Sequence, residues 1–280
     1  MTLATDCTAR PHAEHATMQR MTVLRLGPGR SELCDDSVVE EVPAALAYNG
    51  IVHAVMLVTP GDLEEFALGF SLSEGIVGEP GELEGLAVVD SCDGIEIRMD
   101  IPLERFMALK GRRRSLAGRS GCGVCGVESL QAIARGGVAV VPGVRLSAGA
   151  VVRALGRFTE EQVLHRSTGA AHGVAWVDAG GTILAVREDV GRHNALDKLI
   201  GWLVRSGTDP ASGFVLTSSR ASYELVQKTA RMGIGALVAI SAPTGLAVRM
   251  AEECGVSLAG FARGDRLVVY SHGDRWEAAG

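Results

Sequence analysis

Short apolar runs and polar turns alternate along the first 110 residues of the chain. Residues 22–26, 38–43 and 51–58 are rich in valine, isoleucine and leucine, which favours β-strands. Tyr48-Asn49-Gly50 is typical of a tight turn between the last two strands. These runs predict an N-terminal unit that contains a hairpin.

The same unit continues with helical spacing. Asp62 is predicted to be the N-cap of a helix whose apolar side chains recur three and four residues apart, at Leu63, Phe66, Ala67 and Phe70. Further strands are expected at residues 86–89 and 94–99, and a short helix at 103–110. Residues 1–20 show no repeated apolar spacing and are expected to be a disordered lead-in, so the first αβ unit spans residues 21–111.

A second unit is predicted over residues 143–280. A helix at 148–158 precedes a hairpin, and three strand-to-helix steps follow: 182–186 into 195–204, 214–217 into 222–232, and 236–240 into 245–254. Short strands at 256–258 and 267–270 end the unit. Strands that alternate with helices predict an α/β fold with a mostly parallel, helix-covered sheet.

Three polar turns in the second unit follow the predicted strands. Ligands bind beyond the carboxyl ends of strands in such sheets, and helix N-termini favour anions. Arg187, Arg192 and Arg220 lie in these turns and suit phosphate. The pattern therefore predicts an anionic, phosphate-bearing ligand at this edge.

The segment between the two units, residues 112–142, carries a basic stretch and a Cys-x-x-Cys loop. Cys122 and Cys125 are bracketed by glycines, and five cations lie just upstream, at Lys110, Arg112, Arg113, Arg114 and Arg119. Nearby cations and a predicted helix after Cys125 both favour a thiolate. The segment is interpreted as a reactive dithiol on a mobile loop, with the basic run steering anionic partners.

Four functions fit this cysteine pair. A structural zinc site needs two more ligands, which His165, His172 or His193 could supply only through folding. A thioredoxin-like redox pair and an inert structural loop are also open. The fourth is a persulfide carrier, which needs an accessible thiolate and gains from a second thiol nearby.

Other candidate residues each have two interpretations. His193 and Asp189 are either a base with its orienting carboxylate, or Asp189 and Asn194 cap a helix against which His193 packs. The loop at Ser219 and Arg220 either holds a phosphate or only begins a helix. His172 is either a ligand contact or a satisfied strand histidine. Residues 260–266 form either a hairpin turn or a nucleotide-binding segment.

Composition narrows the function classes. The 280 residues are 47% hydrophobic and 4% aromatic, and the net charge of −6 gives no reason to expect nucleic acid. The N-terminus has no apolar signal-peptide run, and no segment is apolar enough to cross a membrane, so a cytoplasmic protein is expected. The six cysteines are not expected to form a disulfide framework, and Cys92 and Cys254 are expected to be buried.

The order of several motifs resembles the FdhD family of sulfurtransferase accessory proteins of formate dehydrogenases. The similar segments run from about residue 40 to residue 270: Glu40-Glu41-Val42-Pro43, Asn49-Gly50, Thr59-Pro60-x-Asp62-Leu63, Cys-Gly-Val-Cys-Gly, Arg187 through Lys198, Ser218-Ser219-Arg220-Ala221-Ser222-Tyr223-Glu224, Ser241-Ala242-Pro243-Thr244 and Gly260-Phe261-x-Arg263.

The resemblance implies a function. Such proteins accept sulfur from a cysteine desulfurase as a persulfide, with Cys122 as the carrier and Cys125 assisting. They deliver it to Mo-bis(molybdopterin guanine dinucleotide), or its tungsten form, before the cofactor enters formate dehydrogenase. The matching cofactor segment is Phe261, Ala262, Arg263, Gly264, Asp265 and Arg266, to which His172, Ser219 and Arg220 are added as candidate contacts; no resident metal is implied.

The resemblance also implies a homodimer, and a second unit with a helix-covered mixed sheet similar to the cytidine deaminase fold beside the smaller N-terminal αβ unit. The chain lacks that fold's catalytic His-x-Glu and Pro-Cys-x-x-Cys, so deamination is not implied. Two further functions stay open: a cofactor-binding chaperone without sulfur chemistry, and a zinc-stabilised nucleotide-binding protein.

Overall fold

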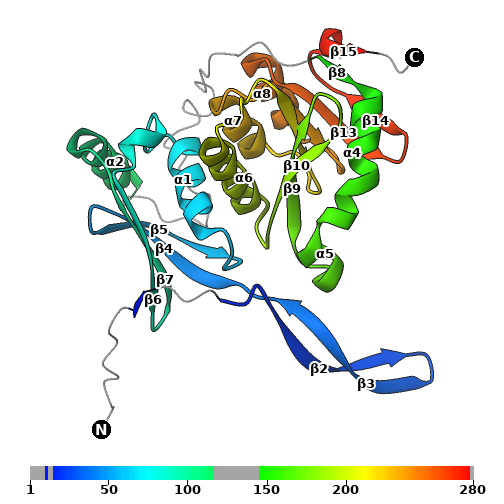
Figure 1. The fold of residues 1–280 in the computed structure, drawn as a ribbon, viewed down its shortest axis with the longest axis horizontal. Coiled ribbons are helices and arrows are strands. Elements are labelled where there is room, and N and C mark those ends of the chain that lie inside the picture. Colours follow the sequence, from blue (N-terminus) through cyan, green and yellow to red (C-terminus); the bar gives the residue numbers. More distant parts are fainter. Residues whose placement is uncertain (1–9, 12–14, 117–144, 278–280) are drawn as a thin grey trace.

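The computed structural model describes residues 10–11, 15–116 and 145–277, with only the backbone described for residues 10–11 and 112–116. Two β-sheets flank a central layer of helices, and a long two-stranded arm projects from one side (Figure 1). Cys122, Cys125 and the rest of the cysteine loop lie outside the described residues. The α/β class predicted from the sequence is confirmed.

The N-terminal sheet has five strands in the order β1-β6-β7-β4-β5. Asn49 and Gly50 both have positive φ, at 47° and 76°, so the predicted tight turn joins β4 to β5. One face of the sheet packs on α1 around Leu46, Phe66 and Ile97. The elements are β1 (Arg10–Pro11), β4 (Val42–Tyr48), β5 (Ile51–Val58), α1 (Leu63–Ser73), η1 (Pro80–Glu82), β6 (Gly85–Ser91), β7 (Gly94–Asp100) and α2 (Leu103–Leu116).

The projecting arm is the antiparallel pair β2 (Met18–Gly27) and β3 (Arg30–Val39). It begins inside the stretch expected to be a disordered lead-in, and β3 starts eight residues before the strand predicted at Val38. Polar residues at Arg30, Ser31, Glu32 and Asp35 hid this strand from an apolar-run criterion. Leu24 and Leu33 face each other across the pair and are 56% and 75% exposed.

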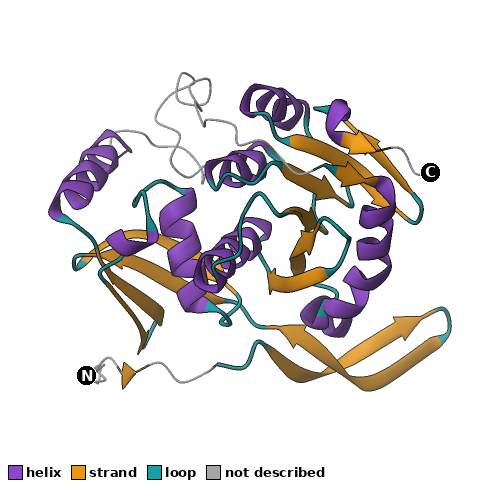
Figure 2. Ribbon diagram, turned by 45° about the horizontal axis from the view of Figure 1, so that its top comes forward, coloured by secondary structure: helices purple, strands orange, loops and turns teal. Residues whose placement is uncertain are grey.

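The C-terminal sheet has six strands in the order β10-β9-β11-β12-β13-β14. Helices α6, α7 and α8 pack on one face and α4 on the other, as Figure 2 shows. The elements are β8 (Leu146–Ser147), α4 (Ala148–Glu161), α5 (Val163–Thr168), β9 (His172–Asp178), β10 (Ile183–Asp189), α6 (Arg192–Ser206), β11 (Gly213–Thr217), α7 (Tyr223–Arg231), β12 (Ala236–Ala239), α8 (Gly245–Cys254), β13 (Ser257–Arg263), β14 (Arg266–Val269), η2 (Gly273–Arg275) and β15 (Trp276–Glu277).

This sheet is mixed, as predicted for the C-terminal unit, although fewer of its strand pairs are parallel than the alternation of strands and helices indicated. Only the β11–β12 and β12–β13 pairings are parallel; β9 runs antiparallel to both of its neighbours and β14 is antiparallel to β13. The antiparallel pairs arise because the hairpin connections at both ends of the unit reverse the chain. The carboxyl ends of β10, β11, β12 and β13 nevertheless meet at one edge, as expected for the predicted polar turns.

Two glycines bring α1 and α6 into backbone contact. A Cβ placed on Gly69 would lie 1.8 Å from the Asp197 carbonyl oxygen, and one on Gly201 would lie 2.0 Å from that of Glu65. Neither position has room for a side chain. This crossing joins the helix of the N-terminal sheet to the first helix of the C-terminal sheet.

A buried polar bridge reinforces the same junction. Lys198 Nζ lies 2.8 Å from Asp189 Oδ2 and donates to the Thr59 carbonyl, while the Thr59 N–H donates to Asp189. Asn194 donates to the Leu57 carbonyl and to Asp189. Because each buried charge has several partners, the desolvation penalty is offset and the end of β5 is fixed against the end of β10.

The cysteines depart from expectation at one position. Cys254 is buried at the end of α8, as predicted. Cys92 is exposed in the turn between β6 and β7 and is disulfide-bonded, so its predicted role as a small buried hydrophobe is wrong. Its neighbours Ser91 and Asp93 are polar, which is the signal of a surface turn.

No helix within residues 10–11, 15–116 and 145–277 is both long and apolar enough to span a bilayer.

Candidate functional site

The polar turns after β11, β12 and β13 form one continuous edge. Ser218 N–H donates to the Gly173 carbonyl and Gly173 N–H donates back to Ser218 Oγ. Thr244 N–H donates to the Ala221 carbonyl, and Phe261 N–H donates to the Ser241 carbonyl. The segments that contain His172, Arg220 and Phe261 are therefore linked by backbone hydrogen bonds. Strand order predicted this position for the turns after β11 and β12. We call this surface the strand-end edge.

One end of the strand-end edge is the β13–β14 hairpin. A bulge between Gly260 and Arg263 places Phe261 in the left-handed region, at φ 50°, with its side chain 48% exposed. Left-handed backbone is strained for a bulky residue and gathers at functional positions. Gly260 permits this shape, because a Cβ there would lie 2.7 Å from Pro243 Cδ.

The other predicted residues of this hairpin divide by burial. Ala262 is 1% exposed and belongs to the core under α4, so its side chain cannot face a ligand. Arg263 and Arg266 are exposed and pair across the Gly264-Asp265 turn, where Gly264 has φ +59°. Segment 260–266 is thus a hairpin turn that presents one aromatic ring and two guanidinium groups.

The centre of the strand-end edge is formed by the β11 turn. Ser219 is buried, and its hydroxyl is 3.1 Å from Thr217 Oγ1 and donates to the Arg220 carbonyl. Arg220 itself is exposed. Of the two predicted residues in this turn, Arg220 is therefore the one that presents its guanidinium to a ligand, and Ser219 shapes the loop.

His172 and His193 lie at the opposite end, beside Arg192. His172 is the first residue of β9 and pairs with Asp189, the last residue of β10. Burial and the charge of Arg192 lower the pKa of His172, and the same causes lower the pKa of His193 to about 4. Both imidazoles are therefore neutral near pH 7.

The predicted pairing of His193 with Asp189 is wrong. Asp189 is fully buried and engages Lys198, Thr59, Gly191 and Asn194. His193 Nε2 instead lies 3.4 Å from Ser222 Oγ and 3.8 Å from Glu224 Oε2. The capping alternative also differs, since Gly191 is the N-cap of α6 and no side chain caps that helix.

Arg187 is likewise not free for a phosphate. Its guanidinium forms two hydrogen bonds with Glu65 on α1, at 2.5 and 3.0 Å, and Asp62 lies 3.6 Å away. Asp62 does occupy the predicted N-cap position of α1 but makes no side-chain capping bond. Both residues serve the junction between the two sheets.

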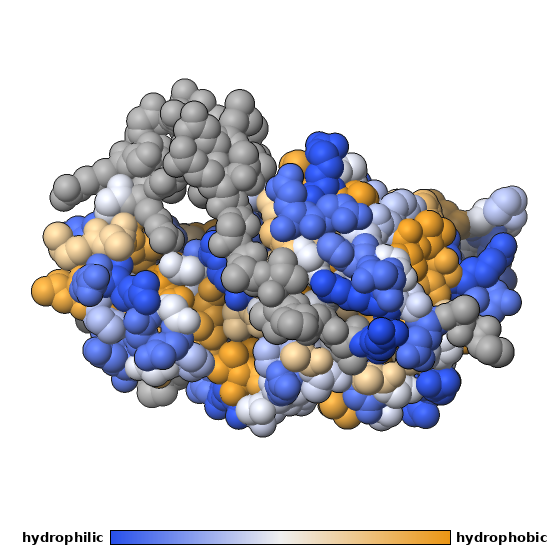
Figure 3. Space-filling model, turned by 90° about the horizontal axis from the view of Figure 1, so that it is seen from above, coloured by the Kyte–Doolittle hydropathy of each residue, from blue (hydrophilic) through white to orange (hydrophobic). Residues whose placement is uncertain are grey.

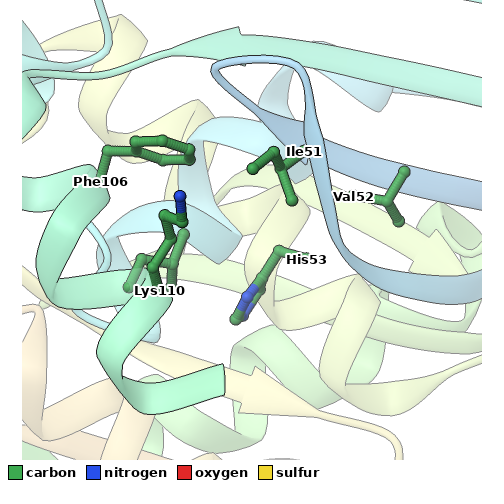
Figure 4. A pocket seen from close by; sticks show the side chains of 6 residues that line it. Ile51, Val52, His53, Phe106 and Lys110 are labelled. Carbon is green, nitrogen blue, oxygen red and sulfur yellow. The ribbon is translucent and has the colours of Figure 1, made fainter. Parts of the chain in front are cut away.

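Two hollows lie away from the strand-end edge. One holds about 10 Å³ between β5 and α2, where Lys110 reaches toward the Phe106 ring opposite Ile51 and His53 (Figure 4). That is room for about one water molecule and not for an organic ligand. The second, of about 270 Å³, is lined by Arg105 and Arg231, which are held by Glu82 and the Ser73 carbonyl.

In the part of the chain that the structure describes, no three His, Cys, Asp or Glu side chains lie close enough together to bind a metal ion. The zinc alternative depends on Cys122 and Cys125, which lie outside this part, and stays a hypothesis.

Comparison with known proteins identifies the family. The FdhD/NarQ family model matches residues 39–277. Proteins called "Sulfur carrier protein FdhD" are similar along most of the chain: that of Cupriavidus necator is 51% identical over 263 residues, covering 94% of this chain and 91% of the relative, and that of Xanthomonas campestris is 50% identical over 254 residues, covering 91% and 90%.

A solved structure supports the fold. The crystal structure of a candidate formate dehydrogenase accessory protein from Desulfotalea psychrophila superimposes with a TM-score of 0.73, at 22% identity, over 94% of this chain and 100% of that one. At this identity the likeness concerns the fold alone. The family model and the relatives at about half identity together show that the chain belongs to the FdhD/NarQ family.

Proposed function

We propose that the protein is a cytoplasmic sulfur carrier that accepts sulfur from a cysteine desulfurase and delivers it to Mo-bis(molybdopterin guanine dinucleotide), or its tungsten form, for formate dehydrogenase. The observation that carries this proposal is the 51% identity, over 94% of the chain, to a protein called a sulfur carrier. The molybdenum cofactor is cargo in this account and not a resident group.

The chemistry assigned to the cysteine pair is balanced without an external oxidant. The Cys122 thiolate attacks the terminal sulfur of the donor persulfide, the donor S–S bond breaks, and the donor cysteine leaves as a thiolate. The Cys125 thiolate can then attack the inner sulfur of the persulfide, Cys122 Sγ; the Sγ–S bond breaks, a Cys122–Cys125 disulfide forms and hydrosulfide leaves. The two electrons come from the dithiol, so a thiol reductant must reduce the disulfide before the next cycle.

The strand-end edge supports binding of the guanine dinucleotide. An exposed aromatic ring in strained backbone is a platform on which a flat base can stack. Arg263 and Arg266 beside Phe261 are exposed cations that suit phosphate. We therefore assign the guanine to Phe261 and its phosphates to the neighbouring arginines, with Arg220 further along the edge.

Guanosine diphosphate binding tests this assignment. Phe261→Ala is expected to raise the dissociation constant roughly tenfold to a hundredfold, because stacking on one base is worth about 1–3 kcal/mol. Val268→Ala removes an exposed apolar side chain from β14 of the same hairpin and should leave binding unchanged. Isothermal titration calorimetry measures both; equal affinity of wild type and Phe261→Ala would exclude Phe261 as the base platform.

A cofactor chaperone without sulfur chemistry is the second candidate. Ligand binding at the strand-end edge would not depend on the chemistry of Cys122. The two functions separate at Cys122→Ala, which a chaperone would tolerate and a carrier would not.

We also propose that two copies of the chain associate through the projecting arm. A two-stranded ribbon is marginal alone in water, and Leu24, Leu26 and Leu33 are each more than half exposed on it. Figure 3 shows further hydrophobic residues exposed among hydrophilic ones on the side of the molecule where α2 lies, the helix that carries the exposed Leu103 and Met107. The exposed leucines of the arm are the apolar surface that we assign to association, and the α2 surface is separate from it.

The double substitution of Leu24 and Leu33 by aspartate is expected to yield a monomer, because like charges and lost apolar area oppose burial of the arm. Ser31→Asp adds a charge near the tip without removing an apolar side chain and should keep the dimer. Sedimentation velocity at micromolar concentration distinguishes the two states. A wild-type monomer, or a dimer that survives the double substitution, would rule out the arm as the interface.

A further inference from the structure

His172, Arg192, His193 and Ser222 form a second group of ligand-binding type at the far end of the strand-end edge. His172 opens β9, Arg192 and His193 open α6, and Ser222 precedes α7, so three elements converge there. His193 Nε2 is 3.4 Å from Ser222 Oγ. His172, Arg192 and His193 are half-buried, and Ser222 is buried.

Arg192 has an uncommitted donor in this group. Its Nε is shielded from solvent and meets no hydrogen-bond partner among the described residues. A buried guanidinium donor without an acceptor is costly unless a ligand or water completes it. The two neighbouring imidazoles are neutral, so each can donate one N–H without adding charge.

Arg192 is the cation of this cluster, and the Glu224 carboxylate is the anion nearest to it. Glu224 lies beside His193. The charges of Lys228 on α7 and of Glu74 at the end of α1 also influence the pKa of His193. Lys228 is bound to both Glu74 and Asp197, and Asp189 is bound to Lys198. The Arg192 guanidinium, one N–H from each of the two imidazoles and the Ser222 hydroxyl form a set of donors that suits an oxyanion.

The distance from Phe261 is set by the strand order. From β13 to β10 the sheet crosses four strand spacings, through β12, β11 and β9. At about 4.8 Å for each spacing, the two ends of the edge are roughly 19 Å apart. The phosphates of a guanine nucleotide stacked on Phe261 are bonded next to the base and its ribose, so they do not reach Arg192.

We propose that His172, Arg192 and His193 bind the oxyanion-like metal end of a dinucleotide whose guanine end lies on Phe261. This inference rests on the proposed function, because it orients the same cargo along the strand-end edge. The reactive end of the cargo is then held over the start of α6, away from the hairpin.

Titration with two separate probes tests the orientation. Molybdate stands in for the metal end and guanosine diphosphate for the nucleotide end, each measured by isothermal titration calorimetry. Arg192→Gln should weaken molybdate binding about tenfold or more and change nucleotide binding less than about twofold, since one charge-assisted hydrogen-bond set is lost. Phe261→Ala should show the reverse pattern.

Controls separate binding from folding. Arg205→Gln, at the other end of α6 and paired with Glu64 on the surface, should alter neither affinity. Arg192→Lys keeps the charge and should retain most of the molybdate binding, with circular dichroism checking the fold. Two results would overturn the inference: no molybdate binding to the wild type, or equal molybdate affinity of the wild type and Arg192→Gln. If the wild type does not bind guanosine diphosphate, the proposed nucleotide-binding function is refuted instead.

Discussion

Gly201→Ala is expected to destabilise the protein by about 3 kcal/mol or more. The new methyl carbon would fall 2.0 Å from the Glu65 carbonyl oxygen, and the Gly69 position on the facing helix is equally closed, at 1.8 Å from the Asp197 carbonyl oxygen. Backbone atoms cannot rotate away as a side chain does, so α1 and α6 must separate. Separation also strains the buried bridge between Thr59, Asp189 and Lys198.

Urea denaturation followed by circular dichroism measures this loss. Gly156→Ala is the matched control, because Gly156 lies on an exposed face of α4, where an added Cβ would meet no atom within 4 Å. That substitution should stabilise by up to about 1 kcal/mol through helix propensity. Equal midpoints for Gly201→Ala and wild type would mean that the two helices are not in backbone contact.

Cys122→Ala is expected to reduce activation of formate dehydrogenase to background. An alanine side chain has no sulfur to attack a persulfide, and Cys125 would lack the partner whose persulfide it resolves. Formate dehydrogenase activity in cells that carry the variant as their sole copy provides the measurement. Cys125→Ala should still accept sulfur on Cys122 but release it more slowly.

Cys34→Ala is the control for loss of a thiol in general. Cys34 is a free cysteine on β3, far in the sequence from the Cys-x-x-Cys pair. Its substitution should leave activation unchanged. Full activation by Cys122→Ala would favour the cofactor chaperone over the carrier.

Sequence periodicity predicted the regular elements that have an apolar face. The spacing of Leu63, Phe66 and Phe70 located α1, and the run from Gly245 to Cys254 located α8 with the same bounds. It missed β3 because that strand is largely exposed and carries charges at Glu32 and Asp35. The alternation of strands and helices overestimated the number of parallel pairs in the mixed sheet, because periodicity within a strand does not record which way its neighbours run.

The strand-end edge was predictable because it depends on order along the chain. Polar turns after successive strands that run the same way must meet at one edge, which placed Arg192 and Arg220 on it. Side-chain partners depend on distances that the sequence does not contain. Arg187 was assigned to phosphate, yet it pairs with Glu65, a residue 122 positions earlier. The partner of Asp189 was also not predictable, because Thr59 follows β5 in the N-terminal sheet, 130 positions earlier in the chain.

Strain at Phe261 could not be anticipated. Phe261 has φ 50° at a bulge where β13 lies against Pro243. The backbone can lie this close because Gly260 has no side chain. A Gly-Phe pair in an apolar run is too common to predict such a bulge. Arg192 and His172 were candidate ligand residues in the sequence, but the contact between His193 and Ser222 was missed, because only the packing of α6 beside α7 brings them together.

Mass spectrometry of the intact protein and its peptides, after incubation with a cysteine desulfurase and cysteine, tests the carrier function most directly. We predict one added sulfur on the peptide that contains Cys122, removed by a reductant and absent in Cys122→Ala. A peptide with neither an added sulfur nor a Cys122–Cys125 disulfide, in the wild type and in Cys125→Ala, would contradict the carrier function when the desulfurase is active and the protein binds guanosine diphosphate.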